Sequence, residues 1–234
     1  MSDELRTNGR IRQRGLTAAL LALLLVGPGA AGEDKADYPL VFEDDFEQGA
    51  QRWQPRDERA WKVVESEAGK VYSQFKQSDY QPPVRSPLNF SLVRDLHLGD
   101  LVLEARLRST VKDYGHRDMC LFFGFQDPSH FYYVHLGKQT DDHANQVFIV
   151  NGAPRRKISI KTSSGTDWDD EWHKVKLVRR VDDGLIAVYF DDMETPVMTA
   201  RDKTFTWGRV GLGSFDDTGE WDDVKLYGVE AQEP

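Results

Sequence analysis

Apolar and polar positions along this chain alternate over short runs that turn residues separate. In residues 101–108 most apolar positions are followed by charged ones, and residues 173–180 show the same period of two. Such alternation predicts half-buried β-strands, and many of them at close spacing predict an all-β sandwich or barrel. The predicted strands are residues 40–43, 61–65, 70–75, 84–86, 101–108, 120–126, 131–136, 146–150, 157–160, 173–180, 185–190, 196–200, 209–213 and 224–229.

Two runs depart from the alternation. Residues 121–125 and 131–134 are apolar or aromatic at nearly every position, which predicts central strands that are covered on both faces. Asn151-Gly152 and Asp183-Gly184 join apolar runs and suit tight hairpin turns. No segment keeps a helical period, and no linker or repeat divides the chain after Tyr38. The pattern therefore predicts a single β-sandwich domain over residues 33–234.

Residues 1–32 have the pattern of a secretory signal peptide. Arg10, Arg12 and Arg14 precede an uncharged apolar stretch at residues 16–26, and small residues follow it. This stretch is shorter than the roughly 20 residues that a transmembrane helix needs. We therefore expect a secreted or periplasmic protein with residues 1–32 removed. An uncleaved N-terminal anchor is the alternative.

Composition and charge narrow the range of partners. The chain has 234 residues, 39% of them hydrophobic, and a formal net charge of −9. Residues 1–32 hold four arginines and two acids, so their removal would make the net charge −11. An acidic protein is poorly suited to nucleic acid or to an anionic membrane. The single cysteine, Cys120, cannot form an internal disulfide and is expected to pack as a small apolar side chain.

Several segments resemble the concanavalin A-like superfamily, which includes laminin-G-like modules, legume-type lectins and glycoside hydrolase family 16. The resemblance lies in residues 170–177, 183–192, 211–213 and 221–227, and in an opening segment at 41–47 that is followed by Trp53. It implies a concanavalin A-like jelly-roll β-sandwich of two antiparallel sheets. One sheet would be concave and would carry a ligand groove.

The resemblance also allows a test for hydrolysis. Family 16 enzymes carry Glu-x-Asp-x-Glu on a central concave strand, because a retaining glycosidase needs two carboxyl groups about 5 Å apart. The matching strand here is residues 130–137, and it contains no carboxylate. We therefore do not expect hydrolysis by that route.

The same strand carries aromatic and imidazole groups. Side chains alternate along a strand, so His130 and Tyr132 share one face while Tyr133 and His135 share the other. The sequence leaves open which set lines the groove. We expect a carbohydrate-binding protein, since tyrosine rings can pack on sugars and donate hydrogen bonds. The candidate ligand residues are Tyr132, His135, Lys138, Gln139, His143, Asn145 and Arg155.

Two other classes of function stay open. A polysaccharide lyase would use Tyr132, Tyr133 or His135 to move a proton, with Gln139, Asn145 and Arg155 neutralising a uronate, and a keto-glycoside hydrolase is a related enzymatic alternative. A structural or protein-binding module of the laminin-G kind is the third class, and a groove filled by its own side chains would favour it.

Loop residues offer weaker candidates. The segment 116–118 is placed at the groove mouth, and Trp168 and Trp207 beside loops are candidate platforms for sugar rings. The resemblance also implies a structural calcium ion on the convex face, held at Asp45, Gly69 and Asp222. The alternative for these acids is a solvated surface. The oligomeric state stays open.

Overall fold

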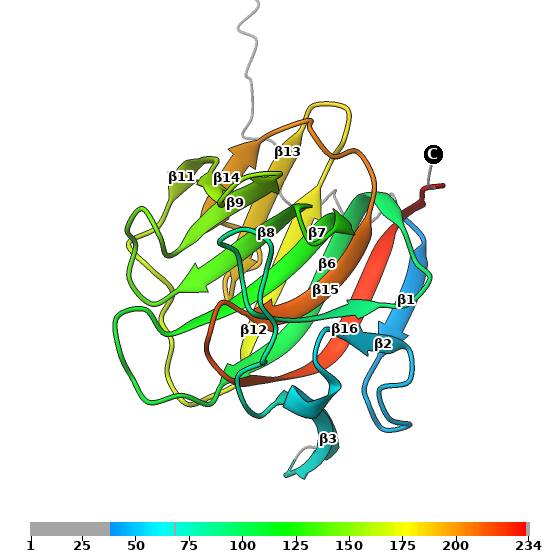
Figure 1. Cartoon of the computed structure of the whole chain (residues 1–234), viewed down its shortest axis with the longest axis vertical. Helices are drawn as coiled ribbons and strands as arrows, with labels where there is room; N and C mark the ends of the chain where they lie inside the picture. Colours follow the sequence, from blue (N-terminus) through cyan, green and yellow to red (C-terminus); the bar gives the residue numbers. More distant parts are fainter. Residues whose placement is uncertain (1–37, 68, 233–234) are drawn as a thin grey trace, which may run out of the picture. The chain divides into compact units, whose positions relative to one another are not determined.

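The computed structural model describes residues 38–67 and 69–232, which belong to one compact unit and fold as a β-sandwich (Figure 1). The expected signal peptide, residues 1–32, lies outside the described residues and stays a prediction. No helix in the described part of the chain has the length and apolarity to cross a membrane. Besides the short 3₁₀ helix η1 (Glu58–Ala60), the described elements are β1 (Leu40–Asp44), β2 (Trp53–Pro55), β3 (Trp61–Ser66), β4 (Gly69–Gln74), β5 (Asn89–Val93), β6 (Leu98–Ser109), β7 (Asp118–Asp127), β8 (His130–Gly137), β9 (Gln146–Asn151), β10 (Arg156–Lys157), β11 (Ser159–Thr162), β12 (His173–Arg179), β13 (Leu185–Phe190), β14 (Met198–Arg201), β15 (Arg209–Ser214) and β16 (Gly219–Glu230).

The strands form two antiparallel sheets. Nine strands make one sheet, in the order β11-β14-β13-β12-β6-β16-β4-β3, with β1 pairing β16 beside this path. Seven strands make the other, in the order β10-β9-β8-β7-β15-β5-β2. Strands distant in sequence therefore lie side by side, as β6 and β16 do in Figure 1. This architecture confirms the expected jelly-roll sandwich.

The main core lies between the sheets. Leu103 and Leu177 of the nine-stranded sheet share one buried cluster with Leu121, Phe123 and Val134 of the seven-stranded sheet. A second cluster covers the opposite face of β7 and β8, with Phe122 and Tyr133 among its members. The expectation of central strands that are covered on both faces is confirmed.

Three sequence expectations differ from the structure. Residues 84–86 form no strand but belong to the connection that lies over the seven-stranded sheet. Strands β2 and β5 were not predicted, because one is very short and Asn89 and Ser91 interrupt the apolar pattern of the other. The run 157–160 divides at Ile158, since β10 pairs with β9 in one sheet and β11 with β14 in the other.

Tyr132 joins β8 to the loop between β14 and β15. Its ring lies in the inter-sheet core, and its hydroxyl donates to Asp202 Oδ1 at 2.5 Å and accepts from the Phe205 backbone N–H at 3.0 Å. Burial, followed by the hydrogen bond to Asp202, raises the pKa of Tyr132 to about 12. Tyr132 is therefore placed as a structural residue of the core.

Tyr132→Phe should lower the free energy of unfolding by about 1–3 kcal/mol, because the buried Phe205 N–H would lose its acceptor. Denaturant unfolding followed by tryptophan fluorescence measures the change. A variant as stable as the wild type would contradict the structural assignment.

Candidate functional site

We call the face of the seven-stranded sheet that points away from the other sheet the outer face. β7 and β8 direct Cys120, Phe122, Phe131 and Tyr133 to this side, and β9 adds Phe148. The rings pack closely, and Tyr133 stacks on Phe148 with centroids 5.1 Å apart. The outer aromatic cluster consists of Phe90, Leu92, Cys120, Phe122, Phe125, Phe131, Tyr133, Phe148 and Val150.

Arg155 covers the middle of the outer face. Its guanidinium carbon lies 4.7 Å from the Phe148 ring centroid and 4.2 Å from that of Phe215, and Nη1 donates to the Tyr133 hydroxyl at 2.7 Å. Tyr80 and Val84 of the connection between β4 and β5 also pack on the cluster, and Figure 1 shows this connection crossing the sheet. The middle of the expected groove is filled by the protein's own side chains.

His135 lies on the outer face of β8, together with Tyr133. The sequence had left open which of the two faces of this strand would line the groove. His135 is 4% exposed, and its ring lies against Phe148 and Phe215. Nε2 lies 3.7 Å from Asp118 Oδ2, while Nδ1 has no hydrogen-bond partner among the described residues. Burial, with Arg155 and His116 nearby, lowers the pKa of His135 to about 3. The imidazole is therefore neutral at physiological pH.

The other candidate ligand residues do not form one site. Tyr132 lies on the inner face of β8, away from His135. Asn145 is buried and donates to Thr140, Thr162 and Ser163. The predicted ligand contacts of these two residues remain untested, but the structure gives their side chains no free surface.

Three further candidates lie at the loop between β8 and β9. Gln139 and His143 are exposed there, and Lys138 pairs with Asp113. The structure thus brings His135 and Arg155 together around Phe148 and Phe215, with Arg155 covering that part of the outer face, and it leaves Lys138, Gln139 and His143 at the surface.

The tryptophan expected to offer a sugar platform in the loop before β12 is not available. Trp168 is 3% exposed, and its Nε1 donates to the Leu136 carbonyl at 2.8 Å. The second candidate, Trp207, is half-buried with its ring beside His97. A loop position alone did not reveal that Trp168 closes the end of the core.

An open pocket of about 360 Å³ lies on the outer face at the end where β7 meets β8. Phe90, Leu92 and Phe125 contribute apolar surface, and each belongs to the outer aromatic cluster. The polar residues around it are Gln54, Arg56, Gln126, Asp127 and Arg209. Sequence reasoning missed this pocket because its residues come from strands β2, β5, β7 and β15, two of which were not predicted.

The polar rim of this pocket is held in place by the fold. Arg209 Nε donates to the Val93 carbonyl at 3.0 Å, while its Nη2 is buried without a partner in the described chain. The Arg56 guanidinium carbon lies 4.4 Å from the Tyr80 ring centroid. Gln126 Nε2 donates to the Trp207 carbonyl at 3.3 Å. Gln54 and Arg56 are exposed and can make new contacts.

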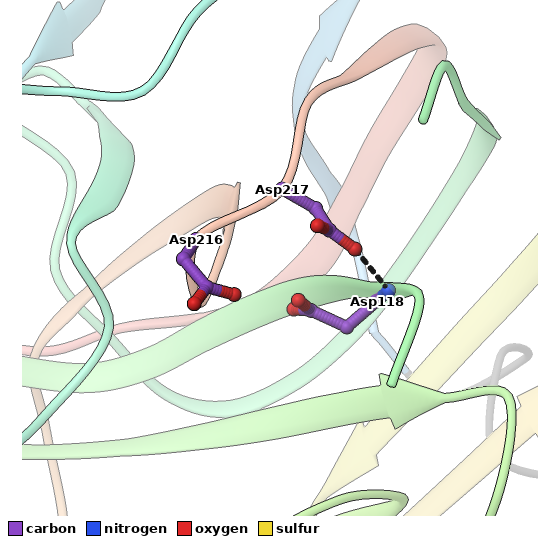
Figure 2. Close-up of side chains that lie close together, drawn as sticks. All are labelled: Asp118, Asp216 and Asp217. Carbon is purple, nitrogen blue, oxygen red and sulfur yellow. Dashed lines mark hydrogen bonds between the residues drawn. The ribbon is translucent and has the colours of Figure 1, made fainter. Parts of the chain in front are cut away.

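An acidic cluster lies at the opposite end of the outer face. Asp118 begins β7, and Asp216 and Asp217 lie between β15 and β16, with carboxylate oxygens within 4.8 Å of one another (Figure 2). The expectation that β8 carries no carboxylate holds, but the neighbouring strand and loop bring three together. Burial and Asp217 raise the pKa of Asp118 well above its usual range.

These acids do not form the two-carboxylate arrangement of a retaining glycosidase. Such a mechanism needs both carboxyl groups beside the sugar. Asp118 is fully buried, and its Oδ2 accepts a hydrogen bond from the Phe215 N–H at 2.8 Å. Burial and this hydrogen bond keep the Asp118 carboxyl group away from a sugar on the surface.

The proposed calcium ligands come to one corner of the other sheet. β16 pairs with both β1 and β4, which places Asp222 beside the segments that carry Asp45 and Gly69. Burial and the neighbouring Asp223 raise the pKa of Asp222 to about 6, with Asp45 contributing and Arg106 opposing. Arg106 Nη1 also lies 3.6 Å from Asp222 Oδ2, so a cation is already present beside this carboxylate, and the calcium site stays a prediction.

Comparisons with known proteins give the fold and no family. No family model and no curated protein matches the sequence. The carbohydrate-binding module CBM66 from Bacillus subtilis superposes with a TM-score of 0.54 at 16% identity, over 76% of this chain and 96% of that one. Domain 4 of AbnA, a GH43 extracellular arabinanase from Geobacillus stearothermophilus solved with arabinotriose, gives 0.51 at 11% identity, over 83% and 95% of the two chains.

A Bacillus subtilis protein of unknown function with a galectin-like fold is also similar. Its TM-score is 0.52 at 12% identity, over 82% of this chain and 97% of that chain. Together these structures define the class of fold as a lectin-like β-sandwich. At such low identity they assign no ligand to this chain.

The neutral His135 predicts a pH dependence of stability. The pKa of His135 falls from about 6.5 in the unfolded chain to about 3 in the folded protein. The neutral ring therefore contributes to the free energy of unfolding above pH 6.5, and this contribution is lost as the pH falls toward 3. His135→Gln should weaken the fall of the melting temperature over this acidic range. Equal pH profiles for the two proteins would contradict the buried, neutral ring.

Proposed function

We propose that this protein binds carbohydrate in the open pocket on the outer face. The observation that carries the proposal is the composition of that pocket, where a rim of amide and guanidinium groups surrounds a floor of two phenylalanines and a leucine that are nearly buried. Planar polar side chains of such a rim bond to sugar hydroxyls, and the apolar floor excludes water beneath them. The proposed carbohydrate site therefore lies on the sheet that the sequence indicated, but at one end of that sheet and not in its middle.

Charge at the rim also suits a neutral or weakly acidic sugar. Arg56 and Arg209 lie opposite a single carboxylate, Asp127, which is paired with His130 at 2.9 Å. Arginine forks donate to adjacent hydroxyls or to a carboxylate. The pocket has a volume of about 360 Å³ and lies at one end of the sheet, so it would hold a short stretch of a glycan or a chain end.

The comparisons support the proposal at the level of fold. CBM66 is named as a carbohydrate-binding module, and the arabinanase domain was solved with arabinotriose. Membership of the concanavalin A-like superfamily, expected from the sequence, is part of the same proposal. A secreted or periplasmic location is the companion proposal, and it rests on residues 1–32 of the sequence.

We also propose a structural calcium ion at Asp45, Gly69 and Asp222. The raised pKa of Asp222 and its neighbouring acids support it. Calcium is the ion that such oxygen donors prefer. Asp222→Asn should weaken calcium binding at this corner by at least about tenfold, as loss of a metal partner does elsewhere.

Calorimetry with arabinotriose and with soluble plant, algal and bacterial oligosaccharides tests the carbohydrate proposal. The double variant Gln54→Ala/Arg56→Ala should lower affinity at least tenfold, because each lost hydrogen bond to a sugar is worth about 1 kcal/mol. Lys161→Ala, an exposed change on the other sheet, is the matched control.

The same titration separates the two candidate regions of the outer face. Gln139→Ala/His143→Ala should leave affinity unchanged if the pocket binds the sugar. Loss of binding in that variant, with Gln54→Ala/Arg56→Ala unaffected, would move the site to the β8–β9 loop. Absence of binding to any glycan would overturn the carbohydrate proposal.

The filled middle of the outer face supports one further candidate, a protein-binding or structural module. Arg155, Phe215 and the connection between β4 and β5 leave no continuous groove there. This class would be favoured if no glycan bound and no glycan were cleaved. The enzymatic alternatives would require new reducing ends or unsaturated products, lost in Tyr133→Phe or His135→Gln.

A further inference from the structure

Three carboxylates converge where β7 begins. Asp118 extends from the strand, and Asp216 and Asp217 approach it from the loop between β15 and β16 (Figure 2). Their oxygen atoms lie within 4.8 Å of one another. Two oxygens on opposite sides of a calcium ion are separated by about twice the Ca–O distance of 2.3–2.6 Å, so the spacing suits one bound ion.

The Asp118 carboxylate supplies an independent sign of a missing partner. It is fully buried, and Oδ1 has no hydrogen-bond partner in the described part of the chain. Oδ2 accepts from the Phe215 N–H at 2.8 Å and from the Cys120 thiol at 3.3 Å. A buried carboxylate oxygen without a partner is costly. Figure 2 shows this carboxylate directed toward the other two.

His135 completes the set of buried polar groups aimed at this point. Its side chain is 5% exposed and makes no hydrogen bond among the described residues, while Nε2 is directed at Asp118 Oδ2 from 3.7 Å.

No lysine or arginine in the described ranges forms an ion pair with Asp118, Asp216 or Asp217. The nearby Arg117 donates instead to Ser109 at 3.0 Å and to Asp170 at 2.9 Å. The three carboxyl groups therefore lie close together without a paired cationic side chain among the described residues.

The loop that carries Asp216 and Asp217 is held in position without an ion. Gln74 and Ser214 both donate to the Asp217 carbonyl oxygen, the latter at 2.7 Å. Tyr114 donates to Asp217 Oδ1 at 2.7 Å, and the Asp118 N–H donates to Oδ2 at 2.8 Å. Each carboxylate oxygen keeps a lone pair for a further ligand. The carboxylate oxygens that would bind an ion are thus already arranged around one point.

We propose that Asp118, Asp216 and Asp217 bind a divalent cation of the calcium type. The ion would complete the coordination of Asp118 Oδ1 and fix the loop between β15 and β16 to the start of β7. Phe215 belongs to that loop and packs against Arg155, so the ion would hold the cover over the middle of the outer face. Its role is structural, and it is separate from the corner formed by Asp45, Gly69 and Asp222.

Calorimetry with CaCl2 on protein freed of metal by EDTA tests the site. Asp216→Asn is the chosen variant, because Asp216 is exposed and its loss should leave the fold intact. It should weaken calcium binding at this site by at least about tenfold. Asp182→Asn, an exposed acid in the turn between β12 and β13, carries the same charge change and should bind as the wild type does.

Stoichiometry separates this site from the proposed calcium corner. If both calcium sites exist, the wild type binds two ions, and Asp216→Asn and Asp222→Asn each keep one site of wild-type affinity. If only the site at Asp118 exists, Asp222→Asn binds like the wild type and Asp216→Asn keeps no site of wild-type affinity. The proposal is overturned if the wild type binds no calcium, or if Asp216→Asn binds as many ions as Asp182→Asn with equal affinity.

Melting curves give a second reading that does not depend on titration heat. Calcium should raise the melting temperature of Asp222→Asn, because the ion binds only the folded state. The double variant Asp216→Asn/Asp222→Asn should show no rise. An equal calcium-induced rise in these two proteins would contradict the site.

Discussion

Burial of both faces of β7 and β8 is the constraint on which the rest of this structure depends. In a sandwich of two sheets, one face of each sheet faces the other sheet, and the remaining faces meet solvent. Here the outer face of the seven-stranded sheet carries phenylalanine and tyrosine side chains that cannot remain in water. The chain therefore supplies a second cover, made of Arg155, Phe215 and the connection between β4 and β5.

Arg155 is suited to this position because its guanidinium is apolar on its flat faces and polar at its edge. It lies over Phe148 and Phe215 and still donates to Tyr133. The cover leaves two ends of the sheet with different chemistry. One end is an open pocket with amides and arginines, and the other is a cluster of acids beneath the loop that carries Phe215. We propose carbohydrate as the ligand of the first and a cation as the ligand of the second.

The sequence predicted the sandwich well because strand periodicity is local. The aromatic runs at 121–125 and 131–134 identified the central strands, because a strand that is apolar at nearly every position is buried on both faces. The sequence could not show which of Tyr132 and Tyr133 faces the core. Alternation places their side chains on opposite faces of β8, but it does not show which face packs against the other sheet. The sequence grouped Arg155 with His135 as ligand residues, and that role stays a prediction. The role of Phe215 depends on a contact between the β9–β10 loop, which carries Arg155, and the β15–β16 loop, and only the topology creates this contact.

Reactivity of the single thiol tests the covered outer face most directly. Cys120 lies in the outer aromatic cluster and is fully buried. With a disulfide reagent, the native protein should react only at its slow rate of opening, and the thiol should react at once in denaturant. Arg155→Ala should speed the native reaction. Rapid reaction of the native wild-type protein would show an open groove and contradict this account.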